Sequence, residues 1–429
     1  MMIGFAGLSH LGLVSSAAAA STGLVVVGFD PDAALVAALK TGHLPVSEPG
    51  LRGLIAGESR PSFTAEAAAL SRCDVVYIAL DVPTTDTGQS DLTGLVSLID
   101  LVWPHLRRDA VLVLLSQVPP GFTRQLEARR ASSSDGPGAI YYQVETLIFG
   151  NAVARALHPE RYIVGCADPA APMPETFLTV LEPFGCPVIP MRYESAEFAK
   201  ISINCFLVSS LSTTNLLAEV CEQIGADWSE IAPALRLDAR IGPKAYLGPG
   251  LGFGGGNLGR DLNTVKRLAG EHGTDARIID SWLANSRYRR DWALRLLHAR
   301  ILDVRPDTAI GVWGLAYKPD TAFMKNSPAI ALLEALPGRQ IRAYDPAARL
   351  ERATFPTVLQ VDDAIAACRG TDVLMVMTPW VEFRSIPAGR IREAMRGRQI
   401  IDPYGALDSA DTKTAGFEHY RLGEAWSAN

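Results

Sequence analysis

The chain lacks any cluster of cysteines. Six cysteines are spread over 429 residues, with no CxxC motif and no spacing typical of metal ligands. In a chain of this length they predict reduced core thiols of a cytoplasmic protein and no bound metal. Excess positive charge is also absent. The net charge of -6 argues against a nucleic-acid-binding surface.

Signals for export and for membrane insertion are lacking as well. The first residues, Met1 to Gly7, are apolar but have no basic segment before them, so no signal peptide is expected. The alanine run at 17–20 is flanked by serines and a threonine, and no stretch approaches the roughly 20 apolar residues that span a bilayer. With 48% hydrophobic and 20% charged residues, the chain can bury the cores of two or three domains.

The N-terminal segment has the layout of a dinucleotide-binding βαβ unit. Met2 to Ala6 is a short apolar run that predicts a buried strand, and Gly7-Leu8-Ser9-His10-Leu11-Gly12 follows it. An alanine-rich helix then precedes a second strand, Leu24 to Phe29, which ends at Asp30. Such a turn presents helix N-terminal amides to a pyrophosphate, and the acid meets a ribose hydroxyl. Ser9 stands where the middle glycine belongs, and Asp30 favours NAD over NADP. A generic βαβ turn with a capping aspartate is the alternative.

Strands and helices continue to alternate through the first half. Strands are predicted at 74–80, 111–115, 140–144 and 161–164. The loop at Asp81-Val82-Pro83-Thr84 lies where a cofactor crevice is expected, and Glu145 follows the strand at 140–144. A flexible loop is expected at 132–138. We therefore predict one doubly wound domain over residues 1–190.

The middle of the chain, residues 191–299, predicts a helical domain. Residues 194–225 contain no proline and no internal glycine before Gly225, so they are expected to form one long helix. Lys200 and Asn204 share one face of it, either as a snorkelling lysine with an exposed amide or as a polar pair directed into a cleft. Such a helix is a candidate for the core of a homodimer, and a helix at about 278–301 is expected to pack beside it.

A glycine-rich stretch follows at 250–256, and it is either a flexible loop or a backbone that approaches a ligand closely. The last third predicts a second βαβ domain over 300–429. Its strands are expected at 309–314, 340–344, 372–377 and 399–402, with a helix that begins near Ser327-Pro328. This domain lacks a glycine fingerprint. The fold class is therefore α/β, with two Rossmann-like doubly wound domains joined by a long central helix.

Over nearly its whole length the chain resembles the UDP-glucose/GDP-mannose dehydrogenase family. The matching residues occur in the family's order and spacing: the glycine turn with Asp30, Glu48-Pro49-Gly50-Leu51, Val118-Pro119, Glu145, Pro159-x-Arg161, Lys200-x-x-x-Asn204, Arg240-Ile241-Gly242, Gly252-Phe253-Gly254-Gly255, Asp261, Ala316-Tyr317-Lys318, Lys325, Ser327-Pro328 and Trp380-x-x-Phe383. The resemblance implies that the first domain binds NAD and that the last binds the nucleotide of a nucleotide sugar, with a UDP-sugar favoured.

The resemblance also implies roles for individual residues. Lys200 would stabilise a developing alkoxide, Asn204 would hydrogen-bond the same oxygen, and Asp261 would orient water or act as a base. Glu145 and Asn257 complete the expected catalytic set. Substrate contacts are expected from Thr146, Leu147, Arg240, Tyr246, Phe253, Gly254 and Lys318. Cofactor contacts are expected from Gly7, Ser9, His10, Leu11, Gly12, Asp30, Pro83, Ser116, Gln117 and Lys325.

Several of these positions depart from the family pattern. Asn257 stands where family enzymes carry the cysteine whose thiolate attacks an aldehyde intermediate, and an amide is not a nucleophile at neutral pH. Phe149 occupies the position of a second glutamate in the family, Gln117 that of a threonine and Arg260 that of a lysine. Tyr404 stands for an arginine that contacts the nucleotide.

Three reactions remain open, and the first two rank above the third. The protein releases the product of one two-electron oxidation, or it oxidises and reduces again as a redox-neutral epimerase, or it oxidises an aldehyde hydrate directly with Asp261 or Glu145 as base. A non-catalytic nucleotide-sugar-binding protein is a further alternative, against which the retained Lys200 argues. Hydroxy-acid dehydrogenases share the first domain and a helical middle, but they lack the third segment.

Overall fold

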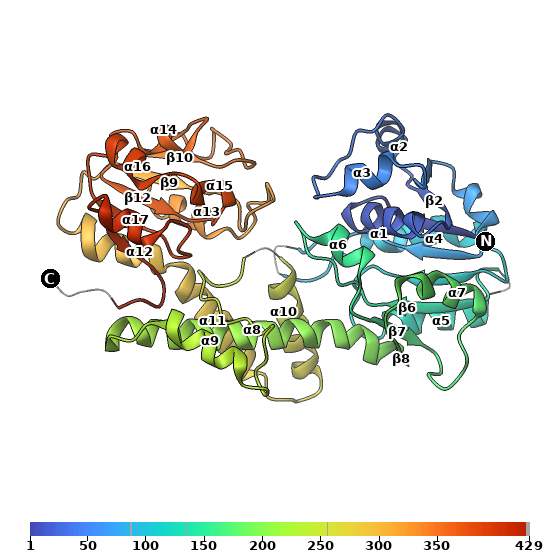
Figure 1. Cartoon of the computed structure of the whole chain (residues 1–429). Coiled ribbons are helices and arrows are strands. Elements are labelled where there is room, and N and C mark those ends of the chain that lie inside the picture. Colours follow the sequence, from blue (N-terminus) through green and yellow to red (C-terminus); the bar gives the residue numbers. More distant parts are fainter. Residues whose placement is uncertain (86–87, 134, 255, 426–429) are drawn as a thin grey trace. The chain divides into compact units, whose positions relative to one another are not determined.

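The computed structural model describes residues 1–85, 88–133, 135–254 and 256–425. The chain divides into two compact units, Met1–Ile203 and the part from Asn204 onward. Each unit contains its own sheet, and we describe each by itself (Figure 1). The expected loop at 132–138 and the glycine stretch each include one residue outside the described part, Ser134 and Gly255.

The first unit is built on a sheet with the strand order β3-β2-β1-β4-β5-β6-β7-β8. The strands are β1 (Met2–Ala6), β2 (Val25–Phe29), β3 (Ser62–Thr64), β4 (Val75–Ile78), β5 (Val111–Leu114), β6 (Ala139–Gln143), β7 (Tyr162–Cys166) and β8 (Val188–Arg192). The order reverses between β1 and β4, and in such sheets ligands bind in the crevice at the carboxyl ends of these strands. The predicted dinucleotide layout therefore lies at the expected place.

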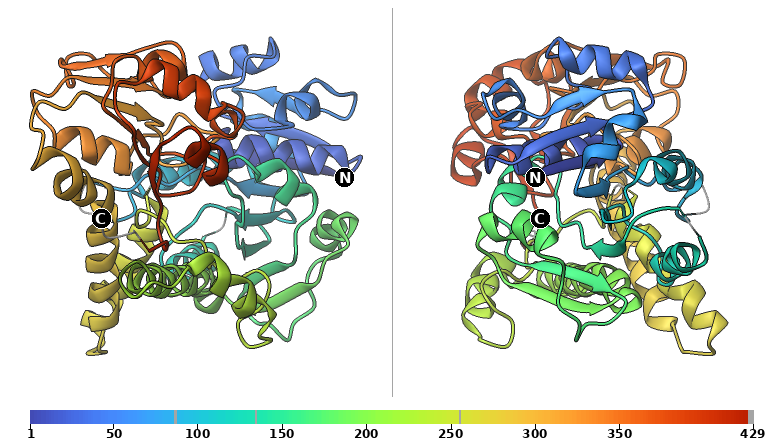
Figure 2. Two further views of the ribbon diagram at one scale, coloured as in Figure 1. Left: turned by 60° about the vertical axis from the view of Figure 1, so that its left-hand side comes forward. Right: turned by 90° about the vertical axis from the view of Figure 1, so that its right-hand side faces the viewer.

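Alternation along the strands divides the side chains between two cores. In β4, Val75 and Tyr77 enter one buried cluster, whereas Val76 and Ile78 enter the other. Helices cover both faces of the sheet because both faces are apolar (Figures 1 and 2). They are α1 (His10–Ser21), α2 (Ala33–Lys40), α3 (Leu51–Ala56), α4 (Thr93–Val102), α5 (Phe122–Ser132), α6 (Ala152–Leu157) and α7 (Glu175–Leu181).

A single long helix, α8 (Tyr193–Ile224), runs from the first unit into the second and confirms the predicted long helix. By length and composition alone, α8 would also suffice to cross a membrane, which the sequence patterns did not predict. Its start is nevertheless tied to the first unit by a buried acid. The Glu197 carboxylate accepts hydrogen bonds from the Gly121 and Thr123 amides, at 2.6 and 2.8 Å. These contacts are typical of a helix packed inside a protein.

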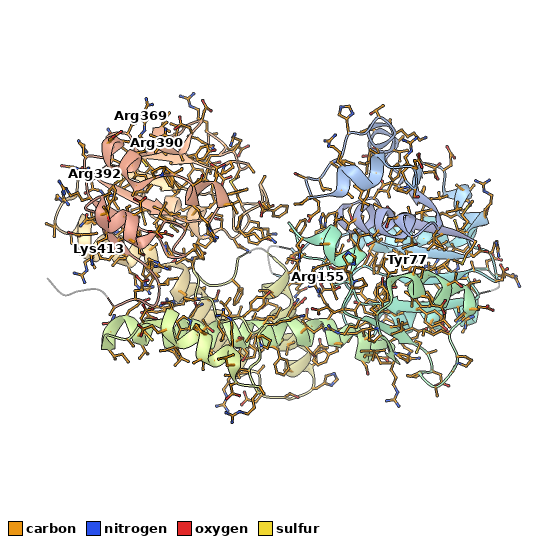
Figure 3. The ribbon with its side chains drawn as sticks, in the orientation of Figure 1. Tyr77, Arg155, Arg369, Arg390, Arg392 and Lys413 are labelled. Carbon is orange, nitrogen blue, oxygen red and sulfur yellow. The ribbon has the colours of Figure 1, made fainter. Side chains whose placement is uncertain are left out.

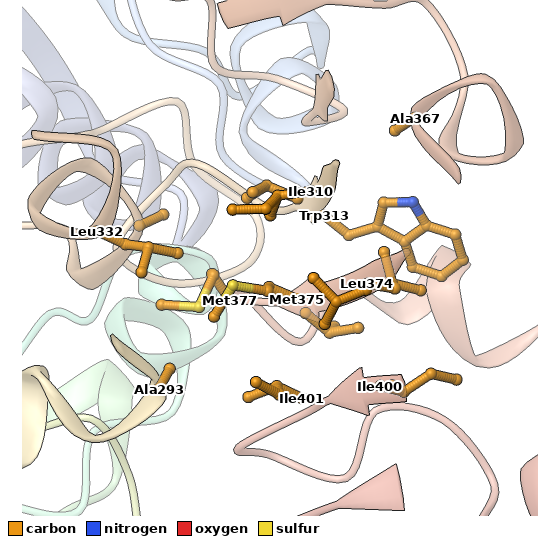
Figure 4. Packing of buried hydrophobic residues seen from close by; sticks show 14 of the residues in the cluster. Ala293, Ile310, Trp313, Leu332, Ala367, Leu374, Met375, Met377, Ile400 and Ile401 are labelled. Atoms are coloured by element: carbon orange, nitrogen blue, oxygen red, sulfur yellow. The ribbon is translucent and has the colours of Figure 1, made fainter. Parts of the chain in front are cut away.

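The second unit contains a sheet with the order β11-β10-β9-β12-β13-β14. Its strands are β9 (Ile310–Trp313), β10 (Ile341–Tyr344), β11 (Val358–Gln360), β12 (Val373–Val376), β13 (Gln399–Ile401) and β14 (Glu418–Tyr420). The order repeats that of the first six strands of the first unit, so the prediction of two Rossmann-like folds is confirmed. Ile310, Leu374 and Ile400 lie in its core with Trp313, whose indole donates a hydrogen bond to the Ala364 carbonyl at 2.7 Å (Figure 4).

Helices of the second unit pack around this sheet and along α8. They are α9 (Trp228–Leu237), α10 (Asn257–Glu271), α11 (Arg277–Arg290), α12 (Trp292–Leu297), α13 (Pro328–Glu334), α14 (Ala364–Cys368), α15 (Val381–Arg384), α16 (Ala388–Ala394) and α17 (Ser409–Thr414). The predicted start of α13 is confirmed, because the Ser327 hydroxyl accepts the Ala329 amide as its N-cap.

Some local predictions differ from the structure. The helix expected at 278–301 is interrupted at Asp291, between α11 and α12. It does pack beside α8, since the Trp292 indole donates to Glu222 at 3.0 Å and the Tyr288 hydroxyl to Glu219 at 2.9 Å. The strand pair β6–β7 is antiparallel. Four short edge or outer strands (β3, β8, β11 and β14) were not predicted, because three to five residues carry little periodicity.

Candidate functional site

The turn between β1 and α1 is held by glycine in two ways. Gly7 has a φ of +91°, and its amide donates to the Phe29 carbonyl at 2.9 Å, which closes the turn against β2. A Cβ on Gly12 would lie 1.8 Å from the Gly7 carbonyl oxygen. Any side chain at Gly12 would therefore push α1 away from the strand end. The two outer glycines thus have the roles expected of a dinucleotide turn.

Asp30 lies at the carboxyl end of β2, as predicted, and is almost buried. Its carboxylate accepts hydrogen bonds from the Leu8 amide at 2.8 Å and from the Asp32 amide at 3.0 Å. These bonds orient the carboxylate at the edge of the turn. The position fits a ribose-binding acid, because an oriented carboxylate retains lone pairs for a hydroxyl donor.

The His10 side chain turns into the protein. Its Nε2 lies 3.0 Å from the Glu48 carboxylate, and its ring stacks on Phe149 with the ring centroids 4.1 Å apart. Glu48 also accepts the Gly150 and Ala152 amides, at 3.0 and 2.7 Å. A cofactor contact from His10 therefore falls to its backbone amide. Phe149, which replaces the second glutamate expected from the resemblance, belongs to this packing.

The ends of β4 and β5 are joined through Ser116. Its hydroxyl donates to the Leu80 carbonyl at 2.7 Å and accepts the Leu80 amide at 2.9 Å. The predicted cofactor residues Pro83 and Gln117 lie in the loops that leave these two strands, and the Pro83 carbonyl accepts the Asp91 amide at 2.9 Å. Ser116 thus holds together the two strand ends that border the crevice.

Lys200 and Glu145 form an ion pair in the first unit. The lysine Nζ lies 3.4 Å from Glu145 Oε2, and the two side chains are only 14% and 17% exposed. The other carboxylate oxygen of Glu145 accepts the Leu147 amide. Arg155 of α6 donates to the Thr146 carbonyl at 2.6 Å, which supports the same loop (Figure 3). The polar-pair interpretation of Lys200 is therefore favoured over a lysine that reaches into water.

Asn204, one helical turn after Lys200, belongs to a buried cluster of the second unit. Its side-chain amide donates to Asp261 Oδ2 at 2.5 Å, and the Arg260 guanidinium lies 3.3 Å from Asp261 Oδ1. All three side chains are almost buried. The cation balances the charge of Asp261, and the carboxylate in turn orients the Asn204 amide. Burial and the nearby Asp261 charge raise the pKa of the Cys205 thiol to about 11.

The glycine loop before α10 is packed against three parts of the second unit. The Gly250 amide donates to Asn215 of α8 at 2.8 Å, and the Phe253 amide donates to the Ser286 hydroxyl of α11 at 3.0 Å. Gly252 has a φ of +72°, and a Cβ there would lie 2.4 Å from the Ser286 carbonyl oxygen. A Cβ on Gly254 would lie 3.1 Å from the Tyr317 side chain. Internal packing thus accounts for two of the glycines without a ligand.

Asn257 is the first residue of α10 and is exposed. The N-terminus of a helix of 15 residues lowers the pKa of a thiol placed on it, so a cysteine at 257 would be activated there. The amide of Asn257 has no proton to lose at neutral pH. Burial raises the thiol pKa of all six cysteines that the chain does contain.

The remaining predicted substrate residues are distributed over the second unit. Arg240 is exposed and pairs with Asp238 at 2.7 Å, and the Tyr246 carbonyl accepts the Ser210 and Thr214 hydroxyls. Lys318 lies over the Tyr317 ring, 5.6 Å from its centroid. Lys325 is exposed in the loop before α13. The structure thus brings the predicted residues together in separate groups within each unit.

The second sheet shows that an acid after a second strand is not always a ribose ligand. Asp345, which follows β10, is fully buried and accepts the amides of Leu315, Ala316, Ala347 and Ala348 and the indole of Trp380. Five donors leave this carboxylate no room for a substrate hydroxyl. Its role is to hold the loop after β9. Tyr404 packs beside Gly250, and burial raises the pKa of its phenol to about 12.

Two contributors to these groups were not among the predicted site residues. Asp81, in the loop after β4, accepts the Leu11 amide at the start of α1 at 3.2 Å. Its signal was an acid at the carboxyl end of a strand beside the crevice. Arg260 was noted only as a departure from the family, although it is the cation that meets Asp261. Within the described ranges, no group of three His, Cys, Asp or Glu side chains is arranged to hold a metal ion.

Comparisons with known proteins cover nearly the whole chain. Three models of the UDP-glucose/GDP-mannose dehydrogenase family match it: the NAD binding domain at residues 1–184, the central domain at 194–287 and the UDP binding domain at 311–409. The UDP-glucose 6-dehydrogenase TuaD of Bacillus subtilis is 30% identical over 97% of this chain and 92% of its own length. The UDP-glucose 6-dehydrogenase AglM of Haloferax volcanii is 32% identical over 95% of this chain and 99% of its own length.

Solved structures show the same similarity. A UDP-glucose dehydrogenase from Pyrobaculum islandicum superposes with a TM-score of 0.85 at 27% identity, and the match covers 99% of this chain and 98% of that one. A UDP-D-ManNAc dehydrogenase from Pyrococcus horikoshii superposes with a TM-score of 0.83, covering 99% of both chains, at 24% identity, which bears on the fold alone.

Proposed function

The chain belongs to the UDP-glucose/GDP-mannose dehydrogenase family and is an NAD-dependent oxidoreductase, and we propose that it carries out a single two-electron oxidation of a hydroxyl on a nucleotide sugar. The observation that carries this proposal is Asn257. It occupies the N-terminus of α10, where a thiolate would be stabilised, and it offers an amide instead. The product is an aldehyde or a ketone that leaves without becoming an acid.

The chain's own cysteines support this limit on the reaction. Cys205 is the one that lies near Asp261, but burial raises its pKa to about 11, so the thiol stays protonated at neutral pH. A protonated thiol is a poor nucleophile. A thioester route to an acid therefore lacks its attacking group among the cysteines of the chain.

Lys200 and Glu145 have different roles at the substrate hydroxyl. The Lys200 ammonium stabilises the oxygen as it becomes an alkoxide and then a carbonyl. Glu145, whose Oε2 lies 3.4 Å from Lys200 Nζ, accepts the hydroxyl proton. NAD, when bound, would supply the hydride acceptor for the carbon that bears this hydroxyl. Both groups are shielded from water, which strengthens the charge interactions between them and the substrate.

Asn204 and Asp261 act as positioning residues in this scheme. Asp261 is held between the Asn204 amide and the Arg260 guanidinium, and it is almost completely buried. It therefore serves to orient Asn204, whose amide then hydrogen-bonds the substrate.

A UDP-sugar is the substrate that we favour. The match of residues 311–409 to a UDP binding domain and the similarity to UDP-glucose 6-dehydrogenases support this choice. The half-buried Lys318 and the exposed Lys325 provide positive charge for the diphosphate. Tyr404 packs against the glycine loop in the same unit and offers an aromatic surface there.

We further propose a homodimer formed through α8. Exposed apolar side chains form a stripe along α8, from Phe206, which is 79% exposed, through Leu217 and Val220 to Ile224, which is 68% exposed. These positions share one face of the helix, because their spacings of 11, 3 and 4 residues each come close to whole turns. An apolar stripe of this kind on a soluble surface marks an interface.

The experiment that tests the reaction uses the purified protein, NAD and a panel of UDP-, GDP- and dTDP-sugars. NADH absorbance and product mass are followed together. We expect one NADH per product and a mass lower by two hydrogens. Two NADH with a carboxylic acid would overturn the proposal. A product of unchanged mass and new stereochemistry, without net NADH, would identify an epimerase instead. Saturable binding without any product would identify a binding protein.

Two variants sharpen this test. Asn257→Ala is expected to keep the stoichiometry of one NADH, because neither an amide nor a methyl group can form a covalent bond to the aldehyde. Asn257→Cys is expected not to restore acid formation, since Phe149 and Gln117 also differ from the family pattern. Recovery of a carboxylate by this single change would show that the cysteine alone was missing.

A further inference from the structure

The N-terminus of α1 in the first unit is bound to an acidic side chain from the loop after β4. The Leu11 amide donates to Asp81 Oδ2 at 3.2 Å. In the reverse direction, the Asp81 amide donates to the Ser9 hydroxyl at 2.9 Å. The Ser9 hydroxyl also lies 3.4 Å from the Ala79 carbonyl, to which it donates. The turn and the loop are therefore joined by contacts in both directions.

These contacts use the donors that a dinucleotide needs. The first-turn amides of a helix have no partners within the helix, and in a βαβ turn they bind the pyrophosphate. The Asp81 carboxylate is an anion on one of these amides. Ser9 adds a side chain at the position where the fingerprint has its middle glycine, which lets the backbone approach the pyrophosphate. The turn made by Gly7, Gly12 and Asp30 fits NAD, but the Asp81 carboxylate already accepts the Leu11 amide at its anion site.

We propose that Asp81 is an intramolecular competitor of the NAD pyrophosphate. Its carboxylate must leave the Leu11 amide before the pyrophosphate can bind there. This inference concerns the cofactor site and does not depend on which sugar is oxidised. Asp81 thereby sets the affinity for NAD, and the protein binds NAD more weakly than its glycine turn alone would allow.

The surroundings of Asp81 support a carboxylate that can move and that is not held by an ion pair. Asp81 is exposed, so the side chain can turn into water without displacing a packed neighbour. In the described part of the first unit, no cationic side chain forms an ion pair with it. Its negative charge therefore adds directly to the repulsion that the pyrophosphate meets.

The size of the effect follows from two contributions. An anion at a helix N-terminus is stabilised modestly when exposed, and a second anion a few ångströms away is repelled by a similar amount in water. Together they amount to about a tenfold change in the dissociation constant for NAD. Salt should reduce this difference, because the charges involved are exposed.

The test is calorimetric titration of the full-length protein with NAD at low and high salt. Asp81→Asn keeps the shape and an oxygen that accepts from Leu11, but removes the charge. We expect it to bind NAD about tenfold more tightly than the wild type at low salt, with a smaller gain at high salt. Asp81→Leu, which removes the acceptor as well, is expected to bind at least as tightly as Asp81→Asn.

Asp168→Asn is the matched control. Asp168 is also exposed and also accepts one backbone amide, from Ala170 at 2.9 Å. It follows β7, which runs antiparallel to β6, so it lies at the opposite edge of the sheet from the crevice. Its substitution removes the same charge from the unit and is expected to leave the NAD affinity unchanged.

Three other outcomes would contradict the proposal, and one would support it. If Asp81 only caps α1, Asp81→Asn will lower the melting temperature and leave the NAD affinity unchanged or weaker. Equal tightening by Asp168→Asn would mean that net charge alone is responsible. Failure of the wild type and of both Asp81 variants to bind NAD would show that Asp81 is not what limits the site. Binding that appears only in the Asp81 variants would support the competition.

Discussion

Lys200 offers the sharpest test of the proposed chemistry, because its partner Glu145 is known from the structure. Lys200→Met keeps the apolar stem and removes the ammonium. A cation about 3 Å from a developing alkoxide interacts by roughly 5 kcal/mol at an effective dielectric constant of about 20. Loss of one such donor from an active site lowers kcat by about 100- to 1000-fold. We expect a loss of that size, with the affinity for the sugar nucleotide nearly unchanged.

A double-mutant cycle separates two explanations of such a loss. If Lys200 only neutralises Glu145, then Lys200→Met should cause no further loss in a Glu145→Gln background, because the charge that it neutralises is already gone. If Lys200 acts on the substrate, the double variant should be slower than Glu145→Gln. Single-turnover NADH formation at saturating substrate is the assay, and sugar-nucleotide binding is measured separately. A double variant as fast as Glu145→Gln would refute the alkoxide role.

The same pair makes a modest contribution to stability. Both side chains are largely but not fully buried, so breaking the pair should cost about 1–2 kcal/mol, between the values for exposed and fully buried pairs. Lys266→Met, which breaks an exposed pair with Asp280, is the control for removing a lysine. It should leave both the rate and the stability close to those of the wild type.

Two further predictions concern the second unit. Gly252→Ala should lower the free energy of unfolding in urea by about 2–4 kcal/mol, because the methyl group would meet the Ser286 carbonyl and the backbone φ is positive. The control is Gly270→Ala, in open space on α10, which should be neutral or slightly stabilising. An equal loss of stability in both variants would contradict the packing argument. Val220→Glu should convert the proposed dimer to a monomer in sedimentation velocity, whereas Ser281→Glu, on an exposed part of α11, should not; a dimer that survives Val220→Glu would place the interface elsewhere.

Local patterns were sufficient for much of the fold. The apolar runs at β1 and β4, the glycine turn, the proline-free stretch of α8 and the Ser327 cap all depend on residues that are close together in the chain. These features arise from backbone sterics, hydrophobic periodicity and helix capping. Each of these acts over a few neighbouring residues, so it can be recognised in the sequence without knowledge of tertiary contacts. The domain boundaries predicted from these patterns stay a prediction.

The site contacts needed the tertiary structure. Leu11 and Asp81 are 70 residues apart, and Asn204 and Asp261 are 57 apart. No periodicity specifies which distant acid reaches which donor, because that choice depends on how the strand ends meet at one edge of a sheet and how helices pack. The glycine loop is a similar case, since Ser286 explains Gly252 only once α11 is packed against it.

Asp30 and Asp345 show the difference most clearly. Both follow the second strand of a βαβ unit, so the sequence by itself determined that each carboxylate would lie at the carboxyl end of a strand. Only the tertiary structure decided their roles, because the number of donors around each is set by the packing of neighbouring loops. Asp30 accepts two amides and can still meet a ribose, whereas Asp345 is enclosed by five donors and holds its own loop together.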